Sequence, residues 1–176
     1  VAALLEGLGS GAVSNPVEDV AQAEVILLIG ANPASNHPVA ASWIKNAIQR
    51  GAKLMLADPR ATPLARFARW HLAFRPDTDV ALLTGMLNVI VAEGLVDEAF
   101  VKARVNGYET VKAAVAEATP ERMAEICGVP AETLRDCARA FASSKASIIL
   151  WGMGVSQHVH GTDNARCLIA LALLTG

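Results

Sequence analysis

Short runs of hydrophobic residues alternate along the chain with longer segments in which hydrophobic and polar residues recur with helical periodicity. The runs occupy residues 24–30, 53–57, 70–74 and 146–150. The first run, EVILLIG, is continuous and ends in glycine, as expected of a strand buried on both faces. Helical patterns follow at residues 38–50, 62–67, 80–93 and 162–174. This alternation with short connections predicts an α/β fold, a mostly parallel sheet flanked by helices on both faces.

The stretch at about 95–143 has a different character, because its patterns are helical throughout. Thr119 and Pro120 form a helix start, and Gly128 followed by Pro130 forms a stop and a restart. The expected helices are 97–105, 108–118, 120–127 and 130–143. We therefore expect residues 1–176 to form a single α/β domain with an all-helical insertion at about 95–143.

Composition and charge exclude several classes of protein. Hydrophobic residues make up 53% of the chain and charged residues 18%, which is too apolar for a disordered segment. The net charge of −2 offers no overall basic field for nucleic acid or an anionic membrane. The apolar runs are too short for a membrane span. Cys127, Cys137 and Cys167 form no C-x-x-C motif, which argues against a zinc or iron–sulfur site and favours small core residues in a reduced, cytoplasmic protein.

Polar loops directly follow the expected strands. They are Gly30–His37, Asp58–Arg60, Arg75–Asp79 and Gly152–Gln157. In an open parallel sheet such loops gather at one edge, where helix N-termini favour phosphate. The pattern predicts a site for a large phosphate-bearing ligand, although neither G-x-G-x-x-G nor a Walker loop is present. Asp58 fits two interpretations equally, an acceptor for ribose hydroxyls or a turn former before Pro59.

A pair of histidines and a pair of helices resemble a metal site and a DNA-binding motif, but the surrounding residues support neither. His158 and His160 lie two apart with no carboxylate or cysteine fixed nearby, so we interpret them as hydrogen-bonding residues rather than metal ligands. The paired helices at 119–145 resemble a helix-turn-helix, but their basic and acidic residues balance, which argues against DNA binding.

Long strings of the sequence resemble one enzyme family. GANPASNHPVAASWIKNAIQRGAKLMLADPR and ILWGMGVSQHVHGTDNARCLIALALLTG are similar to the molybdopterin-guanine-dinucleotide oxidoreductases, and among these to the catalytic (alpha) subunits of formate dehydrogenases. HLAFRPDTDVALLTGMLNVIVAEGLVDEAFV and TPERMAEICGVPAETLRDCARAFASSK resemble the same subunit in the same order. The resemblance covers essentially the whole chain.

The resemblance implies a Rossmann-like layer that binds one of two molybdopterin guanine dinucleotides, with molybdenum or tungsten. It assigns to cofactor binding Asn32, Ser35, Asn36, Asp58, Arg60, Thr78, Asp79, Gly152, Met153 and Gln157. One position departs from the family: Asp77 stands where a glycine is frequent. The family's metal-ligand residue and iron–sulfur cysteines match no residue of this chain.

The resemblance therefore implies an internal fragment of a formate dehydrogenase, inactive by itself. Its partners would be the remaining domains of the same subunit and electron-transfer subunits. Two alternatives stay open. The chain could be the equivalent domain of another molybdopterin oxidoreductase, of the nitrate reductase or formylmethanofuran dehydrogenase type, or a non-catalytic nucleotide-binding module.

Overall fold

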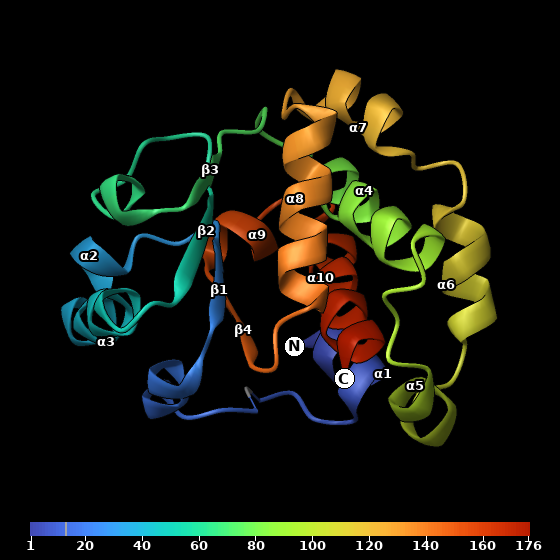
Figure 1. Cartoon of the computed structure of the whole chain (residues 1–176), viewed down its shortest axis with the longest axis horizontal. Helices are drawn as coiled ribbons and strands as arrows, with labels where there is room; N and C mark the ends of the chain where they lie inside the picture. The colour runs from blue at the N-terminus through green and yellow to red at the C-terminus, as the bar shows by residue number, and fades with distance from the viewer. Residues whose placement is uncertain (13) are drawn as a thin grey trace.

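A four-stranded parallel sheet forms the centre of the molecule (Figure 1). The computed structural model describes residues 1–12 and 14–176. The strands are β1 (Val25–Ile29), β2 (Lys53–Ala57), β3 (Trp70–Leu72) and β4 (Ser147–Trp151), in the order β3-β2-β1-β4. Ile29 is in register with both Ala57 and Trp151, so the strands end at one level. The α/β class predicted from the sequence is confirmed.

Helices connect and surround the strands. The α-helices are α1 (Ala2–Leu8), α2 (Pro33–Asn36), α3 (Pro38–Gln49), α4 (Asp79–Ala92), α5 (Glu98–Arg104), α6 (Tyr108–Val115), α7 (Pro120–Cys127), α8 (Ala131–Ala142), α9 (Met153–Ser156) and α10 (Gly161–Thr175). Two 3₁₀ helices, η1 (Val17–Gln22) and η2 (Ala65–Phe67), complete the order. Residues 95–143 hold α5 to α8 and no strand.

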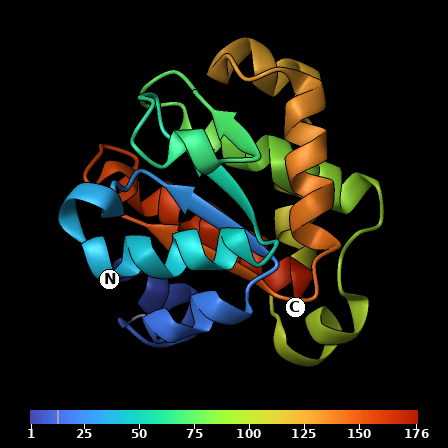
Figure 2. The same cartoon turned by 60° about the vertical axis from the view of Figure 1, so that its left-hand side comes forward.

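The sheet is covered on both faces because its central strand is apolar at every position. All five residues of β1 are buried. Successive side chains of a strand point to opposite faces, so Ile26 and Leu28 join the core under α3, η1 and η2, while Val25, Leu27 and Ile29 join the core with α4, α8 and α10. Figure 2 shows α3 in front of the sheet and α10 behind it.

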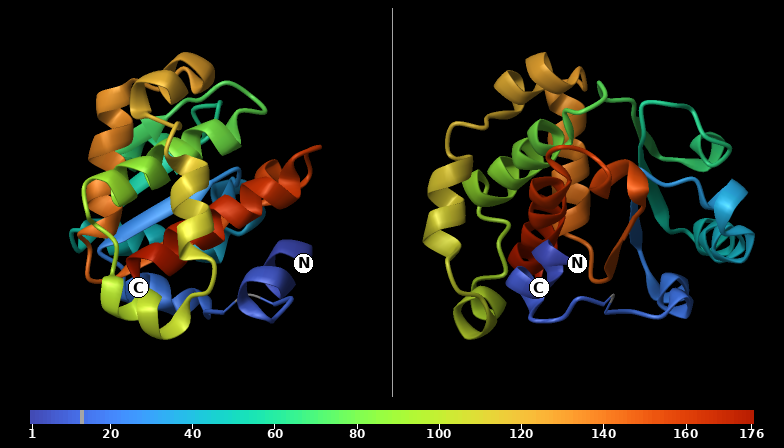
Figure 3. Two further views of the ribbon diagram at one scale, coloured as in Figure 1. Left: turned by 90° about the vertical axis from the view of Figure 1, so that its right-hand side faces the viewer. Right: turned by 180° about the vertical axis from the view of Figure 1, so that it is seen from behind.

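Helix α4 explains much of the high apolar content of the chain. It packs against α10 and α8 and is covered by α6 and α7 (Figure 3), which is why its sequence is apolar on nearly all sides. Its buried asparagine, Asn88, donates through Nδ2 to the backbone oxygen of Val115 at 2.8 Å. The outer helices therefore attach to α4 through both apolar packing and a satisfied polar group.

Helix ends follow the sequence signals closely at α7. The side chain of Thr119 accepts a hydrogen bond from the backbone N–H of Arg122, and Gly128 ends the helix with a φ of 81°. These are the start and stop that Thr119-Pro120 and Gly128 predicted.

Some boundaries differ from the sequence prediction. Both α2 and α9 lie in segments expected to be loops, β3 ends at Leu72 rather than residue 74, and the helix expected at 62–67 is only η2. Each difference involves a segment of one turn or less, where the apolar pattern is too short to be specific.

The three cysteines lie in or against the main core, as predicted. Burial raises the pKa of the Cys137 thiol to about 12 and that of Cys167 to about 11. Both therefore stay protonated at neutral pH, as expected of core residues. In the described part of the chain, no helix is long and apolar enough to cross a bilayer.

Candidate functional site

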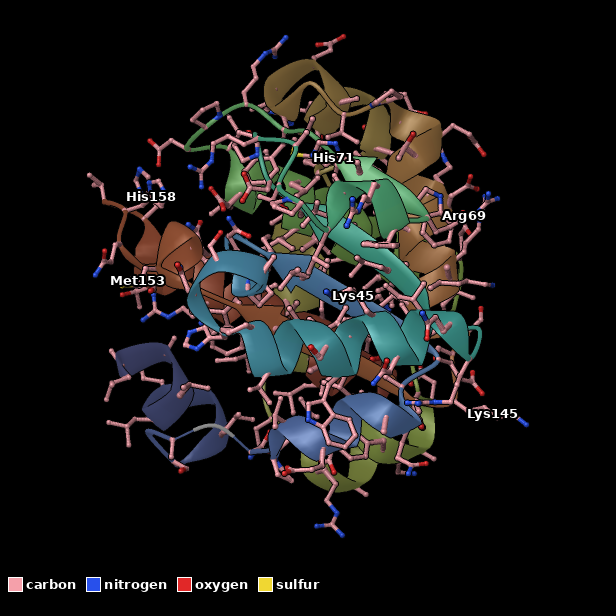
Figure 4. All side chains as sticks on the ribbon, turned by 90° about the vertical axis from the view of Figure 1, so that its left-hand side faces the viewer. Lys45, Arg69, His71, Lys145, Met153 and His158 are labelled. Carbon is pink, nitrogen blue, oxygen red and sulfur yellow. The ribbon has the colours of Figure 1, made fainter. Side chains whose placement is uncertain are left out.

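The carboxyl ends of the four strands bring together the ten residues that the resemblance assigned to cofactor binding. Asn32, Ser35 and Asn36 follow β1, Asp58 and Arg60 follow β2, Thr78 and Asp79 follow β3, and Gly152, Met153 and Gln157 follow β4. Figure 4 shows Met153 and His158, which follow β4, at the opposite side of the molecule from Lys145, which precedes it. The predicted edge is thus a single region of the fold.

The loops after β1 and β4 touch through their backbones. The N–H of Gly154 donates to the oxygen of Gly30 at 3.0 Å, and the N–H of Gly152 donates to the oxygen of Ile29 at 3.3 Å. A Cβ atom at Gly30 would lie 2.7 Å from the backbone of Gly154, and one at Gly152 would lie 2.8 Å from the oxygen of Gly30. The close approach that glycine permits at position 152 is used by the neighbouring loop, and a cofactor contact at Gly152 stays a prediction.

The first loop folds around Asn32. Its Nδ2 donates to Oγ of Ser35 at 3.0 Å, and its backbone oxygen accepts from the N–H of Asn36 at 3.1 Å, which closes the single turn of α2. The other amide atom, Oδ1, is buried and has no hydrogen-bond partner in the described chain. Ser35 and Asn36 themselves are exposed.

Asp58 is buried at the end of β2, with 4% of its surface exposed. Its Oδ1 accepts from the backbone N–H of Arg60 at 2.8 Å, and its backbone oxygen lies 3.0 Å from Nε2 of His71. The turn-forming interpretation of Asp58 is therefore correct, and it does not exclude the ribose role, because a carboxylate has several acceptor positions. The Arg60 side chain extends into solvent.

Thr62 lies in the loop after β2, at the same edge, and was not among the residues assigned from the sequence. Thr62 is 7% exposed, and its Oγ1 is buried without a hydrogen-bond partner in the described chain. Nothing in its local sequence signals this, because a threonine in a loop usually turns its hydroxyl to solvent or to a nearby carbonyl.

The turn after β3 carries a concentration of charge. Asp77 adopts a φ of 66°, the left-handed conformation that glycine prefers, so the aspartate has the backbone conformation of the glycine that the resemblance led us to expect. Its Oδ1 lies 3.8 Å from Nδ1 of His158, which joins this turn to the loop after β4. Oγ1 of Thr78 donates to the backbone oxygen of Arg75 at 2.6 Å.

Asp79, the first residue of α4, is 2% exposed, and its Oδ1 has no partner in the described chain. Burial raises the pKa of the Asp79 carboxyl, although its own backbone N–H and the nearby His158 act to lower it. A buried acid with a raised pKa is frequent at functional sites.

We expect Asp79→Asn to stabilise the fold at neutral pH. Because the pKa of Asp79 is raised on folding, the stability associated with its protonated form is present below the unfolded pKa and is lost as the pH rises through the folded pKa. Urea unfolding should therefore show an advantage for the asparagine variant at neutral pH that shrinks on acidification. Asp77→Asn, which removes an exposed charge, is the control. Lower stability of Asp79→Asn at neutral pH would contradict the account.

Three unpaired buried atoms give this edge its chemical character. They are Oδ1 of Asn32, Oγ1 of Thr62 and Oδ1 of Asp79, and each follows a different strand. Buried polar atoms are almost always paired, and an unpaired one costs about 1–3 kcal/mol. A ligand that offers several N–H or O–H donors would satisfy them.

A separate hollow lies at the amino ends of the strands. Its volume is about 550 Å³, and its lining includes Glu24, Lys53 and Ser143. None of the three unpaired atoms belongs to it. We therefore place the candidate site at the carboxyl edge, because the unpaired buried atoms lie there, and not at the larger hollow.

Comparisons with known proteins match this chain to one family. The model of the family described as "Molybdopterin oxidoreductase" matches residues 5–176. "Formate dehydrogenase H" of Escherichia coli (strain K12) is 41% identical over the whole chain, which covers 25% of that protein. "Periplasmic nitrate reductase" of Desulfovibrio desulfuricans is 38% identical, with 90% of this chain and 22% of that protein covered.

A solved structure has the same fold. Acetylene hydratase from Pelobacter acetylenicus superposes with a TM-score of 0.83 and 30% identity, covering 91% of this chain and 24% of that one. The chain thus spans about a quarter of the length of the curated proteins it matches.

Proposed function

Because the chain belongs to the molybdopterin oxidoreductase family, we propose that it is the part of a formate dehydrogenase that binds one molybdopterin guanine dinucleotide. The similarity to a named formate dehydrogenase along the whole chain supports the choice of enzyme. The three unpaired polar atoms at the carboxyl edge carry the proposal of cofactor binding.

The chemistry of those atoms fits the proposed ligand. Guanine and the pterin each present a ring N–H beside an amino group, and the riboside adds hydroxyl donors. The carboxylate oxygen of Asp79 and the amide oxygen of Asn32 are acceptors, and the hydroxyl of Thr62 can accept or donate. A ligand rich in donors would therefore remove the cost of leaving these atoms unpaired.

The order of the loops suggests how the dinucleotide would lie. In the proposal, Asp58 accepts hydrogen bonds from the guanosine end, while the loops at Asn32–Asn36 and Gly152–Gln157 meet the pyrophosphate and the pterin. The starts of α3 and α10 follow these two loops, and the positive end of a helix dipole favours a negatively charged group. Arg60, Thr78 and Met153 complete the proposed set.

The proposed reaction of the whole subunit is the oxidation of formate to carbon dioxide. When bound, the molybdenum or tungsten held by the pterin dithiolenes would accept formate's two electrons. The role of this chain is to bind and orient the dinucleotide and to exclude water around it. The proposed partners of this chain are the remaining domains of the same subunit, which would hold iron–sulfur clusters, and electron-transfer subunits that would deliver electrons to NAD or another acceptor.

A nitrate reductase is the second candidate, because the identity to the periplasmic nitrate reductase, 38%, is close to that of the formate dehydrogenase, 41%. The domain that holds the dinucleotide would serve either reaction.

Assays of the full-length protein would distinguish the candidates. We expect purified protein loaded with cofactor to reduce a viologen dye with formate and to leave nitrate unreduced. Guanine nucleotide released by acid hydrolysis should accompany the protein in both cases. Nitrate reduction without formate oxidation would replace the proposed substrate, and protein without guanine nucleotide would overturn the proposed cofactor. The 176-residue chain alone should not oxidise formate.

A further inference from the structure

Basic residues are concentrated in one segment of the sequence. Between residues 25 and 76 the sequence has seven basic residues and one acidic residue, Asp58. The basic residues are Lys45, Arg50, Lys53, Arg60, Arg66, Arg69 and Arg75. The acidic residue is buried and already accepts a hydrogen bond within its own turn. The net charge of −2 conceals this separation of charge.

The fold places part of this segment on one face of the sheet. Helix α3 and η2 cover the same face of the sheet, and Figure 4 shows Lys45 and Arg69 on that side of the molecule. Arg66 and Arg69 are exposed. Residues Arg66, Phe67 and Arg69 are called here the arginine surface.

Most of these cations lack carboxylate partners; the exception is Arg60, whose Nε lies 3.6 Å from Oδ1 of Asp58. Among the described residues, Lys45, Arg50, Lys53, Arg66 and Arg69 form no ion pair within 4.0 Å. Arginines elsewhere are mostly paired: Arg135 with Glu121, Arg139 with Glu93 and Arg166 with Glu6. The arginine surface is thus unusual within its own molecule.

Aromatic rings take the place of carboxylates beside these arginines. The guanidinium of Arg66 lies 4.8 Å from the centre of the Phe67 ring, and that of Arg69 lies 5.5 Å from the Trp70 ring. Phe67 is 37% exposed, although it is a large apolar residue. Stacking orders an arginine without neutralising it. Arginine and aromatic residues together are typical of the residues that dominate protein–protein interfaces.

We propose that the arginine surface docks an acidic face of a partner protein. A protein fits better than a nucleic acid, because the acidic residues Glu18 and Asp19 lie in η1, which packs against α3, and Glu24 lies at the amino end of β1. They place negative charge on the α3 side of the sheet, where a phosphate backbone would need a continuous basic track. The inference does not depend on the proposed enzymatic function, since no residue of the arginine surface belongs to the cofactor edge.

The test is a binding measurement on the full-length protein with a fluorescently labelled poly-glutamate peptide at low salt. We expect binding that weakens as salt is added. The double substitution Arg66→Glu with Arg69→Glu should reduce the affinity by at least about tenfold. The matched control is Arg104→Glu with Lys112→Glu, which makes the same charge change at exposed positions of α5 and α6.

Each outcome decides the proposal. Loss of binding in the first variant alone, with unchanged thermal melting, supports it. No binding, or equal losses in both variants, overturns it. A DNA duplex or phosphatidylserine vesicles that bind more tightly than poly-glutamate and depend on Arg66 and Arg69 would also overturn it, in favour of a nucleic acid or a membrane surface.

Discussion

Gly30→Ala is expected to lower the free energy of unfolding by about 3 kcal/mol. Two costs combine at this position. The φ of 56° is a conformation that a side chain disfavours, and the new Cβ would lie 2.7 Å from the backbone of Gly154 and Val155. Those backbone atoms belong to the loop after β4, so the strain would separate the two loops that meet at the candidate site.

Gly94→Ala is the matched control, because Gly94 has a similar φ of 67° and a Cβ added there would meet no atom within 4 Å beyond its chain neighbours. It should cost only the conformational penalty of about 1 kcal/mol. Urea unfolding of both variants measures the difference. Equal losses would mean that the contact between the loops after β1 and β4 contributes nothing to stability.

Asp58→Asn is expected to reduce the affinity for the guanine dinucleotide roughly ten- to hundredfold while the fold survives. Hydrogen bonds to a charged acceptor are worth about 1.5–3 kcal/mol, which gives that range. Asparagine retains an Oδ1 that can accept from the N–H of Arg60, so the turn observed at 2.8 Å should persist. Asp58→Ala would remove both the charge and the turn bond, and should also lower stability.

The control for Asp58 is Glu24→Gln, which removes a carboxylate charge at the opposite edge of the sheet. Glu24 accepts from the backbone N–H of Lys145 at 3.2 Å, a bond that glutamine can keep. Guanine nucleotide per protein, measured after acid hydrolysis, should fall in Asp58→Asn and stay constant in Glu24→Gln. Full occupancy in Asp58→Asn would remove Asp58 from the proposed site.

The strands and long helices were predictable because their patterns are long or unbroken. EVILLIG specifies burial on both faces of β1, and an apolar helix such as α4 requires protein on all sides, which the structure supplies. Helices α2 and α9 were not predictable, since a single turn has no period to detect. The first depends on Pro33 at its start and on a bond from the N–H of Asn36 to the oxygen of Asn32.

The sequence predicted the edge of the sheet at which the candidate site lies, but not the individual side-chain contacts within it. Parallel strands in one register bring the loops that follow them to one edge, whatever residues the loops contain. The unpaired hydroxyl of Thr62 and the approach of His158 to Asp77 depend on packing between distant segments, which no local pattern encodes. The concentration of basic residues between 25 and 76 was missed for a related reason, because the net charge of the chain averages over surfaces that the fold separates.

The central claim is that the carboxyl edge holds the dinucleotide, and hydrogen exchange tests it most directly. Full-length protein would be compared with the same protein from cells unable to make the guanine dinucleotide. The account predicts slower exchange with cofactor in the segments that follow all four strands, at residues 30–37, 58–62, 75–79 and 152–157. Protection confined to the amino edge, around Glu24, Lys53 and Ser143, or no difference at the carboxyl edge, would contradict it.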